Sequence, residues 1–191
     1  MSQAEEIIRF WVEEVGPKGW YAVDDDLDRT IRERFGDLWA AERDGVRRAW
    51  CASPEGALAY LTLTDQFPRN MFRGDGRAFA LDRRALAAAK QAIARDWDLQ
   101  IDGPARQFFY LPLMHSEILA DQDRCVRLFV ARMPEAEDNL FHARAHREVI
   151  RNYGRFPYRN AALGRRNNAA EDAYLDAGGY AETIRMLKTD A

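Results

Sequence analysis

The chain has 191 residues, of which 47% are hydrophobic and 31% are charged, and its formal net charge is −3. This length suits one domain, residues 1–191, with a core of its own. The weakly acidic balance gives no overall attraction to nucleic acid, and no stretch nears the roughly 20 apolar residues that cross a membrane. Residues 1–10 begin acidic and do not resemble a secretion signal. We therefore expect a cytoplasmic protein that binds neither nucleic acid nor membrane.

The first half of the chain has the periodicity of helices. Residues 2–16 repeat apolar side chains at helical spacing and end at a Gly-Pro pair. A second helix is predicted to begin at Asp24–Asp26. A third, residues 52–67, has Ser53 as its N-cap and a proline in its first turn.

The second half continues the same pattern. The alanine-rich residues 81–97 give the strongest helix prediction, because Ala has the highest intrinsic helix propensity. Residues 105–117 predict a helix that Pro112 kinks or ends, and Ser116 is predicted to cap the next one. A helix over 136–153 ends at a glycine, and residues 168–188 form two short pieces hinged at a Gly-Gly pair. About eight helices with short connections predict an all-α array of antiparallel helices.

Polar residues interrupt the apolar stripes of three predicted helices. In the third helix, the spacing puts Asp65 and Arg69 on the face that carries its leucines. His115 shares a face with apolar residues near Pro112. Both His142 and His146 lie on the apolar stripe of residues 136–153. We expect Asp65, Arg69, His115 and His146 to converge at one end of the array.

Two segments have a similar and unusual composition. Residues 66–82 read QFPRNMFRGDGRAFALD, and residues 155–166 read RFPYRNAALGRR. In each, a Phe-Pro pair precedes Arg-Asn, and a second Arg follows beside a Gly. The pattern predicts a rigid loop at a helix exit that presents an arginine, a side chain suited to carboxylates and phosphates.

These residues leave two interpretations open. In the first, a small anionic molecule binds to the arginines Arg69, Arg73, Arg159 and Arg165, with Asp65, His115 or His146 available for proton transfer. In the second, the same side chains form an internal ion-pair network with Asp65 and Glu117, because buried charges are seldom left unpaired. The candidate ligand-binding residues are Asp65, Arg69, Asn70, Arg73, His115, Glu117, His146, Arg155, Arg159, Asn160 and Arg165.

Other chemistries are less well supported. His142, His146 and Asp138 have the spacing of zinc ligands on one helix, but the glutamate of a zinc-protease motif is missing, so we expect no metal and no cofactor. Residues 144–166 hold seven arginines against a single acid, Glu148. A solvated helix face explains this run better than an RNA-binding surface.

The blocks LTLTDQFPRNMFRGDGRAFALD, FFYLPLMHSE and HREVIRNYGRFPYRNAALGR resemble the bacterial domain-of-unknown-function family 924, in the order of that family. The resemblance covers nearly the whole chain. It implies an all-α fold of the tetratricopeptide-like superhelical type, and it implies no activity. Tyr158 and Ile118 depart from the expected pattern, which has a histidine and an acid there. The polar positions that match are Asp65, Gln66, Arg69, Asn70, Arg73, His115, Ser116, Glu117, His146, Arg155, Arg159, Asn160 and Arg165.

The sequence therefore predicts two functions of different kinds. The first is a protein that binds, or acts on, a small anionic metabolite through an Arg/His/Asp cluster. The alternative is a helical-array interaction module that holds a peptide or a partner protein, with the polar cluster serving only as an ion-pair network. Whether the chain is an enzyme does not follow from its sequence.

Overall fold

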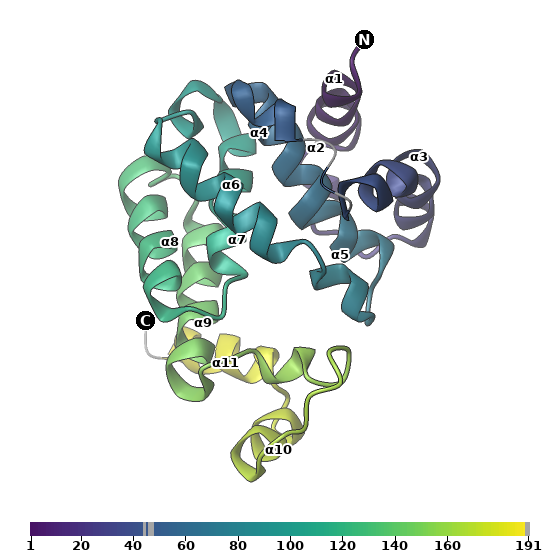
Figure 1. The fold of residues 1–191 in the computed structure, drawn as a ribbon. Coiled ribbons are helices and arrows are strands. Elements are labelled where there is room, and N and C mark those ends of the chain that lie inside the picture. The colour runs from purple at the N-terminus through teal and green to yellow at the C-terminus, as the bar shows by residue number, and fades with distance from the viewer. Residues whose placement is uncertain (44, 46–47, 190–191) are drawn as a thin grey trace. The chain divides into compact units, whose positions relative to one another are not determined.

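The computed structural model describes residues 1–43, 45 and 48–189. Within these residues the chain forms helices, turns and loops and no strand, so the all-α prediction is confirmed (Figure 1). The chain divides into two compact units. Unit 1 comprises Met1–Arg73 and Arg77–Pro112, and unit 2 comprises Gly74–Gly76 and Leu113–Ala191. The single domain of residues 1–191 and the tetratricopeptide-like superhelix stay predictions.

Short π-helical and 3₁₀ segments, labelled η, divide several of the predicted helices. The described residues consequently contain more α-helical segments, α1–α11, than the eight or so expected. In chain order the elements are α1 (Gln3–Ile8), η1 (Arg9–Val15), α2 (Gly16–Gly19), α3 (Asp25–Arg43), η2 (Arg48–Ala52), α4 (Pro54–Leu61), η3 (Thr62–Gln66), α5 (Phe67–Met71), η4 (Gly76–Phe79), α6 (Asp82–Ala94), η5 (Asp98–Gln100), η6 (Gly103–Phe109), α7 (Leu111–Met114), α8 (Leu119–Arg132), α9 (Glu137–Tyr153), η7 (Pro157–Arg159), α10 (Ala169–Asp176) and α11 (Tyr180–Thr189).

Most predicted helix ends are confirmed by the hydrogen bonds found there. Asp24 Oδ1 accepts from two backbone N–H groups at the start of α3, at 2.9 and 3.1 Å. Ser53 Oγ accepts from Gly56 N at 3.1 Å and begins α4. Gly154 ends α9 in the left-handed conformation, with φ 69°. Gly178 and Gly179, both with positive φ, separate α10 from α11.

Unit 1 has a core rich in aromatic side chains, with Phe67 at its centre. The Phe67 ring is fully buried and lies 5.4 Å from Trp11, 4.9 Å from Phe35 and 6.2 Å from Phe10, measured between ring centroids. Because these rings come from η1, α3 and α5, they hold separate segments of unit 1 together.

The first Phe-Pro segment lies inside a helix, so the prediction of a helix-exit loop is wrong there. Residues 54–71 run through α4, η3 and α5 without leaving the helix. In the wider π turn, the N–H of Phe67 bonds to the carbonyl of Thr62. The turn precedes Pro68, which has no N–H to give to a regular helix. The second segment does follow a helix exit, since Pro157 begins η7 after Gly154.

The helix predicted over residues 105–117 is also different in the structure. Residues 103–109 form the 3₁₀ segment η6, and α7 is only Leu111–Met114. Gly103 has φ 65°, and Pro112 cannot donate a backbone hydrogen bond. The N-cap of α8 is Ile118, so the prediction that Ser116 caps this helix is wrong, although Ser116 Oγ accepts from the Ile118 N–H at 3.2 Å.

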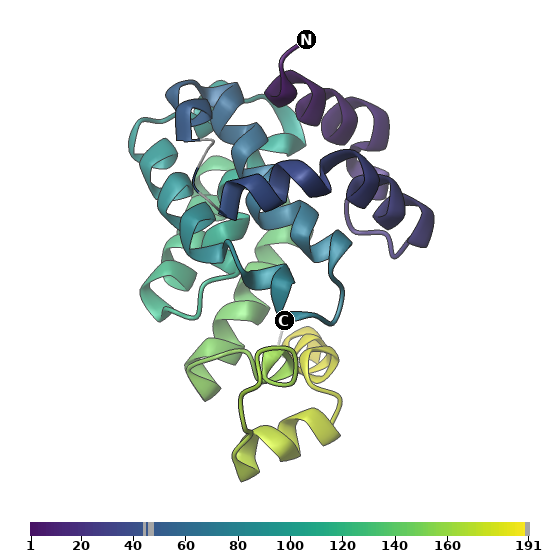
Figure 2. The same ribbon diagram turned by 45° about the vertical axis from the view of Figure 1, so that its right-hand side comes forward.

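Unit 2 is built around α9. Helix α8 packs along α9, from which residues 133–136 separate it, and α11 packs against α9 as well (Figure 1, Figure 2). Val149 and Ile150 of α9 form a core cluster with Phe156, which precedes η7, and with Tyr174 of α10. This cluster fixes the loop after α9, which carries the second Phe-Pro segment.

Candidate functional site

The eleven candidate site residues divide between the two units, and each group is described within its own unit. That all eleven residues lie together in one cluster stays a prediction. Unit 1 holds Asp65, Arg69, Asn70 and Arg73, and unit 2 holds His115, Glu117, His146, Arg155, Arg159, Asn160 and Arg165.

In unit 1, Arg73 and Asn70 hold the carboxylate of Asp28, a residue of α3. Asp28 is buried, and Arg73 donates to both of its oxygens, at 3.0 Å from Nη2 to Oδ1. Asn70 Nδ2 donates to the same Oδ1 at 2.8 Å. Gln66 Nε2 in turn donates to Asn70 Oδ1 at 3.1 Å. The second arginine of the first Phe-Pro segment is therefore engaged by an acid of the same unit.

Arg69 forms the other ionic group of unit 1. Its Nη1 lies 3.2 Å from Asp65 Oδ1, and its Nη1 and Nη2 donate to the two oxygens of Asp82 at 3.1 and 3.0 Å. The side chain of Asp65 is 3% exposed and that of Arg69 is 17% exposed. One guanidinium thus serves two carboxylates in a place that water barely reaches, which favours an ion-pair network here over a ligand site.

In unit 2, Glu117 fastens the loop after α9. Arg165 donates to both Glu117 oxygens at 2.7 and 2.9 Å, and the Phe156 N–H donates to Oε1 at 2.9 Å. Burial by itself would raise the pKa of Glu117, but the Arg165 and Phe156 donors outweigh it, and the pKa lies below its ordinary value. Glu117 is therefore ionised and ties Phe156 to the segment that precedes α8.

Two further candidates also bond within unit 2. Arg155 donates to both oxygens of Glu171 at 2.6 and 2.7 Å. These bonds, with that of the Asn168 N–H, lower the pKa of Glu171 to about 2. Asn160 Nδ2 donates to Asn167 Oδ1 at 2.7 Å. Arg155 and Asn160 thus hold the chain between η7 and α10.

Arg159 is placed differently from the other arginines. It is 6% exposed, its Nη1 donates to the carbonyl of His115 at 3.1 Å, and its Cζ lies 4.3 Å from the centroid of the Phe156 ring. A guanidinium stacks favourably on an aromatic face, so Phe156 fixes the plane of this group. Its positive charge also acts on His146 and helps to lower the pKa of that histidine.

All three histidines of the chain lie in unit 2, where they form with Tyr180 a set that we call the histidine group: His115, His142, His146 and Tyr180. The His146 ring centroid lies 6.2 Å from that of His115 and 4.8 Å from that of Tyr180. The predicted proximity of His115 and His146 is therefore observed. His142 is exposed, so the apolar stripe of α9 is not buried at this position.

Hydrogen bonds fix how the protons are distributed in the histidine group. His146 Nδ1 lies 2.9 Å from the carbonyl oxygen of His142, which can only accept, so His146 Nδ1 carries the proton. The Tyr180 hydroxyl lies 3.1 Å from the same Nδ1 and 2.8 Å from His142 Nδ1. It therefore accepts from His146 and donates to His142. In a neutral His146 ring, the lone pair is consequently on Nε2.

The electrostatic surroundings keep the rings of His142 and His146 neutral. Burial, together with the nearby charges of His115 and Arg159, lowers the pKa of His146 to about 3. His142 is exposed as a residue, but its ring stacks with Tyr180, and this partial burial lowers the pKa of His142, although Asp138 acts in the opposite direction. Burial raises the pKa of Tyr180, so its hydroxyl stays protonated. Among the described residues, none forms a hydrogen bond with His146 Nε2, which leaves a neutral acceptor on this ring.

Several partners of the candidate residues were not predicted from the sequence. Asp28 had a usable signal, because it continues the stripe of Ile31 and Phe35 on α3 as an acid among buried residues. Asp82 and Glu171 lie in the first turns of α6 and α10, and the capping box of Asn168 and Glu171 marks a helix start but not an ion-pair partner. Tyr180 follows the Gly-Gly hinge, and only the fold brings it to His146.

The zinc alternative finds no support in the geometry. Among residues 1–43, 45 and 48–189, no three His, Cys, Asp or Glu side chains are arranged to hold a metal ion. His142 and His146 both direct Nδ1 towards the Tyr180 hydroxyl. In the same part of the chain, no helix combines the length and the apolar character that crossing a membrane requires.

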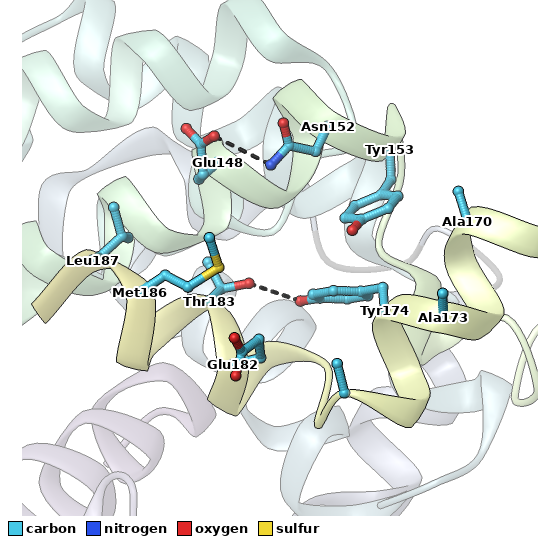
Figure 3. A pocket seen from close by; sticks show the side chains of 11 residues that line it. Glu148, Asn152, Tyr153, Ala170, Ala173, Tyr174, Glu182, Thr183, Met186 and Leu187 are labelled. Atoms are coloured by element: carbon cyan, nitrogen blue, oxygen red, sulfur yellow. Dashed lines mark hydrogen bonds between the residues drawn. The ribbon is translucent and has the colours of Figure 1, made fainter. Parts of the chain in front are cut away.

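Unit 2 also contains a cleft of about 690 Å³ between α9, α10 and α11 (Figure 3). None of the eleven candidate residues lines it, so it is not the pocket that the sequence predicted. Its lining residues are Glu148, Asn152, Tyr153, Ala170, Ala173, Tyr174, Ala177, Glu182, Thr183, Met186 and Leu187.

The fold and these side chains define an all-α protein with arginine–carboxylate pairs in both units and a histidine group in unit 2. Residues 7–179 match a family described as bacterial protein of unknown function, DUF924. The chain belongs to this family, in agreement with the resemblance seen in its sequence blocks.

A solved structure supports the fold. The chain is similar to a protein of unknown function from Agrobacterium tumefaciens, with 37% sequence identity and a TM-score of 0.85. The similarity covers 92% of this chain and 97% of the other. No match was found among curated proteins. The function of the chain thus stays unknown.

Proposed function

We propose that the chain binds a small anionic molecule in unit 2, beside His146 and Arg159. The observation that carries this proposal is the hydrogen bonding of His146. Its Nδ1 is held as a donor by the His142 carbonyl, so its Nε2 is a neutral acceptor to which no described residue donates. Arg159 supplies a positive charge whose orientation Phe156 and the His115 carbonyl fix.

The charges of the unit 2 candidates support an anion as the ligand. Arg155 and Arg165 pair with Glu171 and Glu117, and Arg159 adds a further positive charge close to His146. A neutral imidazole that accepts a hydrogen bond suits an anion that also carries a hydroxyl, such as a monohydrogen phosphate or a hydroxy acid. Because its pKa is lowered to about 3, His146 serves here as a hydrogen-bond acceptor and not as a base. We expect the chain to bind this anion in the cytoplasm.

For unit 1, we propose that the four candidates there are the ion-pair network of the second interpretation. Arg69 and Arg73 both end on carboxylates of their own unit. Binding there would require a ligand to displace carboxylates that are 3–7% exposed at Asp65 and Asp28. The alternative of an interaction module had two parts, a structural ion-pair network and a surface for a peptide or partner protein. The contacts in unit 1 support the first part.

The proposal is tested by thermal unfolding of the full chain in sulfate, phosphate and citrate at pH 7. Sulfate has no hydroxyl at this pH, whereas citrate has one and both phosphate ions present at this pH have at least one. A ligand at a hundred times its Kd stabilises by about 2.7 kcal/mol, which is a shift of several degrees for a chain of this size. We expect phosphate or citrate to raise the Tm, and sulfate to raise it less.

Variants locate the effect. His146→Phe keeps an aromatic ring between its neighbours but removes both nitrogens, and Arg159→Gln removes the charge. Arg144→Gln is the matched control, because Arg144 is exposed on the same helix, α9. The shift should disappear in the first two variants and persist in the control. A shift that survives in both His146→Phe and Arg159→Gln, or the absence of any shift in the wild type, would contradict the proposal.

A further inference from the structure

The cleft between α9, α10 and α11 is separate from the residues of the proposed anion site and has a different chemical character. Its walls are mostly apolar: α10 contributes Ala170, Ala173 and Tyr174, and α11 contributes Met186 and Leu187 (Figure 3). Ala177, the residue after α10, also lines the cleft. The three alanines project little into the space. A volume of about 690 Å³ is within the range of sites that hold small organic molecules.

The aromatic rings give one part of the cleft a definite geometry. Tyr153 of α9 and Tyr174 of α10 lie with their ring centroids 4.6 Å apart, tilted by 34°. The hydroxyl of Tyr174 bonds to Thr183 Oγ1 at 3.0 Å, which holds α10 to α11 and fixes the Tyr174 ring (Figure 3). Met186 is 58% exposed, and its unbranched thioether side chain adapts to the shape of a bound group.

The charges that line the cleft are of one sign. Glu148 and Glu182 are the ionisable acids of the lining, and the lining contains no Lys, Arg or His. The arginines beside them are mostly exposed: Arg151 lies 3.8 Å from Glu148 with 55% of its side chain exposed, and Arg185 pairs with Glu182 with 73% exposed. Because both guanidinium groups are exposed, water weakens their attraction to the carboxylates, so a ligand cation can replace them, although Glu182 itself is only 19% exposed.

We propose that this cleft binds a small organic cation, in which an aromatic or aliphatic body carries an ammonium group. The body packs on the alanines, Tyr174 and Met186, and the ammonium group lies between the carboxylates of Glu148 and Glu182. Tyrosine faces add to the recognition, because a cation is attracted to an aromatic ring. This site is independent of the anion site, and either proposal can fail without the other.

The test is a titration of the full-length ¹⁵N-labelled protein with 2-phenylethylammonium, followed by NMR chemical shifts. For a ligand of this size we expect a Kd on the order of 1 mM. The shifts should concentrate on α9, α10 and α11. 2-Phenylethanol and 3-phenylpropionate have the same ring with no charge or with a negative charge, and both should bind at least about fivefold more weakly.

Variants distinguish binding in the cleft from non-specific binding elsewhere on the protein. Ala173 lines the cleft and is exposed, so Ala173→Leu should fill the cleft and abolish the chemical-shift changes without loss of folding. Ala181→Leu is the control, because Ala181 is an exposed residue of α11 outside the cleft, and this variant should bind normally. Glu182→Gln should weaken binding about five- to tenfold. The proposal is overturned if the alcohol binds as well as the amine, if Ala173→Leu binds normally, or if 10 mM amine shifts no resonance of α9–α11.

Discussion

Replacing Arg73 by Ala tests whether the polar residues of unit 1 are structural. The side chain of Asp28 is 7% exposed, and that of Arg73 is 41% exposed. Without Arg73, Asp28 keeps only the donor of Asn70 among the three bonds that hold it. Breaking a fully buried ion pair costs about 3–5 kcal/mol. Because water can reach the place of the exposed guanidinium, we expect a loss of about 2–3 kcal/mol.

Urea unfolding followed by circular dichroism measures this loss, in the absence of any added ligand. Arg29→Ala is the control, because it removes an exposed pair with Asp26 and should cost less than about 0.5 kcal/mol. Adding Asp28→Asn to Arg73→Ala removes the stranded charge and should recover about half of the loss. A loss below about 1 kcal/mol for Arg73→Ala would refute the network and leave Arg73 available to a ligand.

Two further predictions concern the free energy of unfolding: one tests the buried His146, and the other compares glycines in α3 and at the end of α9. The pKa of His146 is about 3 when folded and near 6.5 when unfolded, so below pH 6.5 the unfolded chain binds a proton that the folded chain does not. Wild-type stability should therefore fall by up to about 2 kcal/mol more than that of His146→Phe between pH 7.5 and pH 5, and parallel Tm curves would contradict this. Gly154→Ala should cost about 1 kcal/mol, because φ is 69° there although an added Cβ meets no atom within 4 Å. Gly36→Ala, inside α3 with the same open space, should instead gain about 0.5–1 kcal/mol in the same thermal unfolding assay, and equal signs for the two variants would refute the backbone argument.

The two Phe-Pro segments illustrate how local sequence can be read correctly in one place and wrongly in another. Both contain a proline that has no N–H, and both were predicted as loops at helix exits. Around Pro157, the preceding Gly154 ends α9, so the prediction holds. Around Pro68, a π turn in η3 absorbs the missing bond, and the helix continues. Where the helix continues through Pro68, Phe67 is buried in the aromatic core of unit 1. The local sequence does not show that core.

The sequence by itself determined the all-α class, most helix ends and the family, because apolar periodicity, capping residues and glycine positions act over a few residues. It also selected arginines that the structure pairs with carboxylates in each unit. It did not determine their partners. Asp28 meets Arg73, Glu171 meets Arg155, and Tyr180 meets His146 across separations that only packing closes. Whether an arginine binds an anionic ligand or a carboxylate of the protein depends on those partners. Only the tertiary structure decides which carboxylates come within hydrogen-bonding distance of it.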